Sequence, residues 1–309
     1  TVSASTADQR SKYRRAINEA LQHADYPLAA EWAQRYLKEH AADADMRGLL
    51  ARALYLGKNH ENAARVLQQD VQASERAEQA PSEQHLQWLQ DCYEQLGDSN
   101  GSLWVLERLV IHHPKRAYWA SLLTLWQKKL GPEHRLTLDF LRLRQATGSI
   151  ATAEDYVQLT TWALRAGSAN EARKTIEDGF SKRILGVGAA ADAHKLLRHQ
   201  AQQQYEEEQK RLTHSDWEAQ ATTAKNGMLL VNTGLALVMQ GESARGISTM
   251  ERGIRLGVSH APQDAKLRLA IGYLYSGQRA KAIDLLRTVT GRGGAADLAR
   301  LWEWHARQS

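Results

Sequence analysis

The segment from residue 86 to residue 114 constrains the fold more than any other, because it has the pattern of a complete helical hairpin. Its first half carries apolar side chains at helical spacing, namely Leu86, Leu89 and Tyr93. Gly97 then breaks the pattern, and a second periodic run ends at Pro114. The apolar face of this second run contains Ser102, Leu106 and Leu109. Two helices of this size cannot bury their apolar faces alone, so the fold requires similar hairpins stacked beside them.

The same hairpin recurs along the chain at regular spacing. Small residues mark the point where the second helix of each pair approaches its neighbours, at Ala29, Ala63, Ser102, Ala172, Gly246 and Ala282. Ala29 and Ala63 lie 34 residues apart. Glycines suited to a positive φ end several first helices, at Gly97, Gly167, Gly241 and Gly277. The pattern therefore predicts an all-α protein built as a solenoid of antiparallel helix pairs.

Three regions follow from this pattern. Residues 10–180 are predicted to form N-terminal repeats, and residues 228–309 are predicted to form C-terminal repeats with a capping helix. Between them, residues 181–227 are rich in Gln, Glu and Lys and predict a long polar helical insertion. Trp302 and Trp304 lie two residues apart in the capping helix, so they cannot share a face. An exposed tryptophan there would favour self-association through this helix.

Composition excludes several classes of function. The 309 residues carry a net charge of +5 and a single cysteine, Cys92, which excludes an internal disulfide and a multi-cysteine zinc site. No apolar run approaches the roughly 18 residues of a membrane span. No phosphate-binding glycine loop, nucleophile elbow or metal-ligand motif is present. We therefore expect no enzyme activity, no cofactor and no metal.

Clusters of basic residues raise nucleic acid as an alternative partner, but one that the rest of the sequence disfavours. They gather at Arg10, Lys12, Arg14 and Arg15, and again at Arg135, Arg142 and Arg144. Acidic residues interrupt the basic pattern elsewhere, and no base-stacking motif accompanies it. A mixed-sign helical surface explains these residues more simply.

The hairpins resemble the tetratricopeptide repeat, whose period is 34 residues. The order of segments is also similar to a group of exported tetratricopeptide proteins of Gram-negative bacteria. The phrases that carry this similarity are APSEQHLQWLQDCY, YWASLL, VNTGLALVMQGE, QDAKLRLAIGYLYSGQ and ADLARLW. The resemblance implies a periplasmic location, with a cytoplasmic one as the alternative. It also raises the expectation of a cleaved signal, or of a longer parent chain upstream of Thr1.

The resemblance further implies a right-handed superhelix whose first helices line a concave groove. The residues at the groove-facing offsets would be Arg14, Asn18, Arg52, Tyr55, Gln84, Trp88, Asp91, Thr124, Gln158, Thr161, Asn232, Leu235, Arg268 and Tyr275. Such a groove would hold a peptide segment or a helix of another protein. Function is therefore expected to be that of a non-catalytic scaffold or adaptor in an envelope assembly. The alternative is a module that binds an envelope polysaccharide or another polymer through the same groove.

Overall fold

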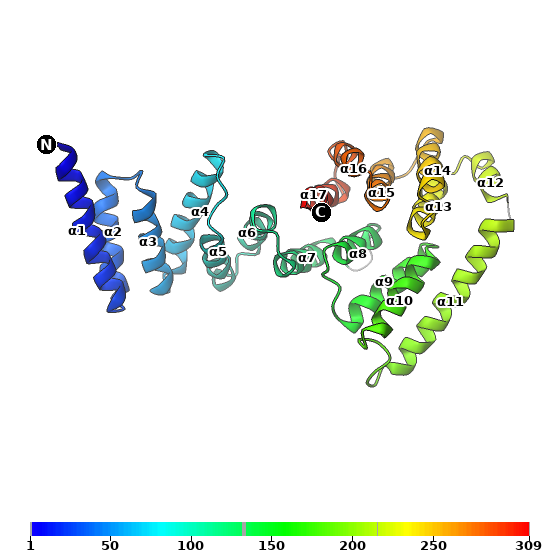
Figure 1. The fold of residues 1–309 in the computed structure, drawn as a ribbon, viewed down its shortest axis with the longest axis horizontal. Helices are drawn as coiled ribbons and strands as arrows, with labels where there is room; N and C mark the ends of the chain where they lie inside the picture. Colours follow the sequence, from blue (N-terminus) through cyan, green and yellow to red (C-terminus); the bar gives the residue numbers. More distant parts are fainter. Residues whose placement is uncertain (1, 132–133, 215, 309) are drawn as a thin grey trace. The chain divides into compact units, whose positions relative to one another are not determined.

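The computed structural model describes residues 2–131, 134–214 and 216–308, and every regular element in these ranges is an α-helix (Figure 1). The helices are α1 (Val2–Gln22), α2 (Tyr26–Glu39), α3 (Ala44–Leu56), α4 (His60–Arg76), α5 (Glu83–Leu96), α6 (Ser99–His112), α7 (Arg116–Leu130), α8 (Thr137–Ala146), α9 (Ala153–Arg165), α10 (Ala169–Ser181), α11 (Ala191–His214), α12 (Trp217–Thr223), α13 (Gly227–Gln240), α14 (Ser243–Leu256), α15 (Pro262–Tyr275), α16 (Arg279–Leu286) and α17 (Ala295–Gln308). Helices adjacent in sequence pack against one another in pairs. The predicted all-α fold of helix pairs is confirmed.

The helices divide into two compact units, Thr1–Leu122 and Leu123–Ser309, so the division falls inside α7. Unit 1 holds α1 to α6 and the first part of α7, and unit 2 holds the remainder. The domain boundaries that the sequence suggested, near residues 180 and 227, stay predictions.

Small side chains and positive-φ glycines define the helix pairs as the sequence predicted. Ala29, Ala63, Ala172 and Ala282 are fully buried at their helix contacts, and Ser102 is 5% exposed. Gly97, Gly167, Gly241 and Gly277 adopt φ values of 68°, 69°, 102° and 78°. An L-residue with a Cβ adopts this conformation only at a cost, which explains glycine at these helix ends.

Unit 1 also ties α1 to the start of α3 through Asp43. This residue caps α3 by accepting the backbone N–H of Met46 at 3.2 Å. The Arg10 guanidinium of α1 donates to the same carboxylate at 2.6 and 3.1 Å, and the Tyr36 hydroxyl donates to it at 3.1 Å. The hydrogen bonds from Arg10 are the main cause that lowers the pKa of Asp43 from 3.8 to about 2.

We expect this contact to weaken in acid. Because the folded pKa of Asp43 lies below its unfolded value, the carboxylate stabilises unit 1 above pH 3.8, and the effect is lost as pH falls towards 2. The effect is roughly 1–2 kcal/mol after allowance for the partial exposure of Arg10. Thermal unfolding of the parent and of Asp43→Asn should therefore differ by this amount at pH 5, and the difference should shrink below pH 3. A difference that stays constant over this range would contradict the prediction.

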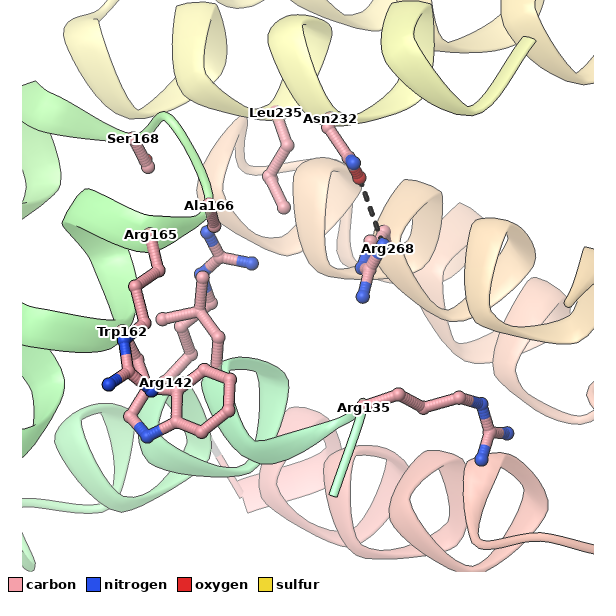
Figure 2. A pocket seen from close by; sticks show the side chains of 10 residues that line it. Arg135, Arg142, Trp162, Arg165, Ala166, Ser168, Asn232, Leu235 and Arg268 are labelled. Atoms are coloured by element: carbon pink, nitrogen blue, oxygen red, sulfur yellow. Dashed lines mark hydrogen bonds between the residues drawn. The ribbon is translucent and has the colours of Figure 1, made fainter. Parts of the chain in front are cut away.

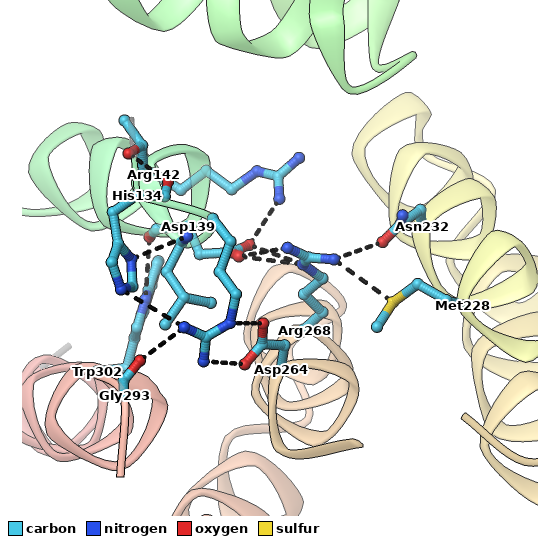
Figure 3. Close-up of polar contacts among 12 residues, drawn as sticks. His134, Asp139, Arg142, Met228, Asn232, Asp264, Arg268, Gly293 and Trp302 are labelled. Atoms are coloured by element: carbon cyan, nitrogen blue, oxygen red, sulfur yellow. Dashed lines mark hydrogen bonds and ion pairs between the residues drawn. The ribbon is translucent and has the colours of Figure 1, made fainter. Parts of the chain in front are cut away.

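Unit 2 is closed by contacts between helices far apart in sequence (Figure 3). Asp139 of α8 is fully buried and forms an ion pair with Arg268 of α15 at 3.0 Å. The backbone oxygen of Asp139 accepts the indole N–H of Trp302 in α17 at 3.3 Å. Arg135, just before α8, donates to Asp264 at 2.8 and 3.0 Å, and to the backbone oxygen of Gly293 at 2.8 Å. One short segment around α8 therefore holds the last helices of the unit.

The long polar helix α11 has a structural role in unit 2. The Ser168 side chain makes no capping bond at the start of α10, and the buried Glu208 of α11 instead accepts the backbone N–H of Ala169 at 3.0 Å. Burial raises the pKa of Glu208, although its bonds to backbone N–H groups of α10 oppose the shift. Arg198 of α11 also pairs with Glu177 of α10. These contacts hold α11 against α10.

Candidate functional site

Seven of the predicted groove residues lie in unit 1, on a row formed by α1, α3, α5 and the first turns of α7. We call this surface the first-helix row. Its helices are joined by the Arg10–Asp43 ion pair, by stacking of Tyr55 of α3 on Trp88 of α5, and by a hydrogen bond from the Gln87 amide of α5 to the Tyr118 hydroxyl of α7 at 2.6 Å. The predicted residues of the row are Arg14, Asn18, Arg52, Tyr55, Gln84, Trp88 and Asp91.

Three of these residues are brought together by direct contact. The rings of Tyr55 and Trp88 stack with centroids 5.2 Å apart, and the Tyr55 hydroxyl is hydrogen-bonded to Asp91. Burial first, and then this bond to Asp91, raises the pKa of Tyr55. The imidazole of His85 stacks on Trp88 at 5.6 Å. All four side chains are half-buried, so they form a rigid aromatic patch rather than a fully covered core.

The remaining predicted residues of unit 1 surround this patch or extend the row. Arg52 and Gln84 are exposed on the same two helices as Tyr55 and Trp88. Arg14 is exposed on α1, and Asn18 is half-buried there. The row therefore presents a basic group and an amide beside the two stacked rings.

In unit 2 the predicted groove residues are placed differently. Asn232 accepts a hydrogen bond from Arg268 at 2.9 Å, and Arg268 is held by Asp139. Gln158 accepts from Gln127 at 3.3 Å, and the Thr161 hydroxyl donates to the backbone oxygen of Val157 at 2.8 Å. Thr124 is exposed on α7. Tyr275 is 41% exposed and borders a small cavity together with Gln145, Glu171, Lys174, Thr175 and Met239.

Asn232, Leu235 and Arg268 converge on a pocket that sequence reasoning did not predict (Figure 2). It has a volume of about 160 Å³. Its walls come from the segment before α8 and from α8, α9, α13 and α15, together with the short segment between α9 and α10. The lining residues are Arg135, Leu138, Arg142, Trp162, Arg165, Ala166, Ser168, Asn232, Leu235 and Arg268.

The charges behind this pocket hold its arginines in place. Arg142 is 4% exposed and donates to Glu171 at 2.9 and 2.8 Å and to Asp139 at 3.0 Å. Burial alone would lower the pKa of Arg142, but the carboxylates of Glu171 and Asp139 outweigh burial and raise it. Arg165 lies over the Trp162 ring, 5.2 Å from its centroid. The Arg142 guanidinium is therefore held in its charged form by these two carboxylates.

One feature of the sequence points to this network. Asp139 is an acidic residue in the middle of the apolar run Leu138, Phe140 and Leu141. A carboxylate at such a position requires a buried cationic partner, because an isolated buried charge is too costly. Arg142, three residues later on the same helix, is one such partner. The second partner, Arg268, depends on a contact between residues 129 positions apart in sequence.

The remaining chemically reactive groups are the single cysteine and the side chains that could bind a metal ion. Cys92 is buried in α5, and burial raises the pKa of its thiol to about 11, so the thiol is protonated at neutral pH. Among the described residues, no three histidine, cysteine or carboxylate side chains form a group that could hold a metal ion. Within the same ranges, no helix combines the length and apolar character needed to cross a membrane.

Comparison with known proteins finds distant structural likenesses. No family model matches the chain, and no curated protein matches it. Among solved structures, the complex of the TPR2AB domain of yeast Sti1 with pHSP90 is similar over 98% of this chain and 100% of that chain, at 14% identity and a TM-score of 0.32. A tetratricopeptide repeat protein from Parabacteroides merdae is similar over 94% and 97%, at 11% identity and a TM-score of 0.33. At TM-scores this low, neither likeness assigns a function to the chain.

Proposed function

We propose that this chain is a non-catalytic scaffold that binds an extended segment or a helix of another protein through the first-helix row of unit 1. The observation that supports it is the stacked pair Tyr55–Trp88, which is half-buried and flanked by the exposed Arg52 and Gln84. Aromatic and arginine side chains dominate the binding energy of protein interfaces. A pair that is already stacked and hydrogen-bonded loses little conformational entropy when a partner covers it.

We place the binding surface in unit 1 rather than in unit 2, because the residues at the groove-facing offsets make different contacts in the two units. In unit 2, Asn232 and Arg268 make their polar contacts within the unit. A partner would have to compete with the buried Asp139 for Arg268. In unit 1, Arg52 is exposed at the equivalent offset. The proposal includes an envelope location, for which the support is the sequence similarity to exported tetratricopeptide proteins.

The test is site-specific photo-crosslinking in an envelope extract. A photoreactive amino acid at position 52, in the first-helix row, should capture a defined protein partner. The same amino acid at position 65, on the exposed face of the second helix α4, is the matched control and should not capture it. Unlabelled parent chain should compete with the crosslink, and unlabelled Arg52→Glu should compete at least tenfold more weakly.

Arg65→Glu serves as the charge-matched competitor and should be as effective as the parent. Equal capture from positions 52 and 65 would contradict the use of the first-helix row. If no protein is captured and glycans instead shift the tryptophan fluorescence of the parent but not of Trp88→Ala, the polysaccharide alternative would replace the scaffold proposal.

A further inference from the structure

A groove of unit 1 gathers polar side chains around an indole ring. It is formed by α4, the end of α5 and the start of α6, and we call it the Trp104 groove. Its volume is about 480 Å³. Small-molecule sites have volumes of roughly 300–1,000 Å³, so a ligand of that class can enter the groove.

The wall from α4 presents a carboxylate, a guanidinium and an amide. Glu61 and Arg65 are exposed one turn apart on α4, where an ion pair between them is possible. Arg65 instead donates to Asn62 at 2.5 Å, and within the described ranges the Glu61 carboxylate has no hydrogen bond or ion pair. The Gln68 amide, one turn further along, has none there either. This wall therefore offers acceptors and donors that no neighbouring side chain uses.

The wall from α6 adds the aromatic surface. Asp98 caps α6 with one carboxylate oxygen, which accepts the backbone N–H of Gly101 at 2.9 Å, and its other oxygen accepts no bond from a described residue. The Asn100 side chain is exposed and likewise makes no bond within the described ranges. Trp104 is half-buried, and the Arg108 guanidinium covers one face of its ring, 3.6 Å from the centroid. This contact fixes the indole in place beside the polar groups.

The equivalent groove one repeat earlier shows that the repeat itself does not require this composition. That groove lies between α2 and the end of α3. Pro27, 34 positions before Glu61, stands there in place of the carboxylate. Of the described residues on its α4 side, only the capping Asn59 lines it, so nothing there corresponds to Trp104. The geometry of the repeat therefore explains the groove but not its indole and its unpaired carboxylate.

The hydroxyl groups of a sugar match this lining. A hydroxyl donates and accepts at one atom, so it can donate to Glu61 or Asp98 and accept from the neighbouring Arg65 or Asn100. The carbon-bound hydrogens of a sugar ring supply an apolar face for the indole. An anionic ligand would meet two carboxylates, and a purely apolar ligand would bury them without partners. A peptide backbone also donates and accepts, but at separate N–H and C=O groups in a fixed order along the chain.

We propose that the Trp104 groove binds a neutral saccharide, with a sugar ring on Trp104 and its hydroxyls bonded to Glu61, Asp98 and Asn100. The site contains none of the predicted residues of the first-helix row. It is therefore independent of the protein-binding role of that row. Unit 1 would then hold a protein and a saccharide at separate sites.

The test is saturation-transfer NMR of the full chain with D-glucose, D-galactose, D-mannose and N-acetyl-D-glucosamine, each added separately. Capped trialanine is the peptide probe. We expect saturable transfer to the ring hydrogens of at least one of these sugars and none to trialanine. Transfer to none of the sugars, or transfer to trialanine in their place, would overturn the proposal.

Variants locate the site on the chain. Glu61→Gln and Trp104→Ala should each weaken the affinity for the sugar by about tenfold or more, because each removes a contact to it. Glu61 is exposed, so its replacement separates loss of binding from loss of fold. Glu31→Gln, which changes an exposed carboxylate of the equivalent earlier groove, should bind like the parent.

Trp88→Ala distinguishes this site from the first-helix row, and it should also bind the sugar like the parent. Loss of sugar binding in Trp88→Ala, with binding retained in Glu61→Gln and Trp104→Ala, would place the saccharide on the first-helix row and overturn the proposal. Equal affinities in the parent and all of these variants would overturn it as well. Failure to capture a protein partner through position 52 would leave the result for the Trp104 groove unchanged.

Discussion

Replacement of Asp139 by asparagine is expected to lower the free energy of unfolding of unit 2 by about 3–5 kcal/mol. The side chain is fully buried and joins Arg142 at 3.0 Å and Arg268 at 3.0 Å. Asparagine keeps the size of the side chain but removes its charge, so the half-buried Arg268 loses the carboxylate with which it pairs. Urea denaturation, followed by far-UV circular dichroism, measures the loss. Trp302 should also become more accessible to a fluorescence quencher, because loosening of α8 would move the backbone oxygen of residue 139, which accepts the indole N–H.

Asp284→Asn is the matched control, since Asp284 is a carboxylate of the same unit that is 80% exposed. Its loss should stay within about 0.5 kcal/mol. A double-mutant cycle between Asp139→Asn and Arg268→Gln should show a coupling energy of about 1–3 kcal/mol. If Asp139→Asn costs less than about 1 kcal/mol, the ion pairs do not hold the unit closed.

The helix pairs could be predicted from sequence because the signals that define them are local. Gly97 ends α5 and Asp98 caps α6 within two residues of each other, and both act on neighbouring backbone groups. The closure of unit 2 could not be predicted in this way, because Asp139 and Arg268 are 129 residues apart and no periodic pattern in the sequence indicates that they pair. The capping of α10 by Glu208 of α11 is likewise a contact between two helices, so a polar sequence reveals only that α11 is helical.

The candidate sites also divide into those set by local repeat geometry and those set by contacts between distant segments. The groove-facing offsets of the repeat placed Tyr55 and Trp88 on one row. The structure brings the two rings into contact, because neighbouring helix pairs in unit 1 repeat one geometry. The same rule selected Asn232 and Arg268, but the closure of unit 2 uses both in internal bonds. Trp162 and Arg165 lie on α9 and were not selected, because a pocket between non-adjacent helices depends on the closure itself.

Replacement of Gly246 by alanine is expected to destabilise unit 2 by about 2 kcal/mol, although alanine is the better helix former by about 1 kcal/mol. A Cβ built at Gly246 of α14 would lie 2.5 Å from the carbonyl oxygen of Gly234 and 2.7 Å from the backbone nitrogen of Val238, both in α13. Backbone atoms cannot rotate away as a side chain can, so the two helices would have to separate. That separation would loosen the buried contacts of Ile247 and Met250, which lie on the same helix.

Ser248→Ala gives the comparison, because Ser248 is exposed on the same helix and its replacement tests helix propensity without a clash. It should leave the urea midpoint unchanged or raise it slightly. If Gly246→Ala were also neutral or stabilising, the helix propensity of alanine would outweigh the clash of its Cβ with α13. Close approach of the two helices would then not require the small residues of this repeat. A midpoint lowered only by Gly246→Ala would show that contact distance is what selects glycine in the second helix of this pair.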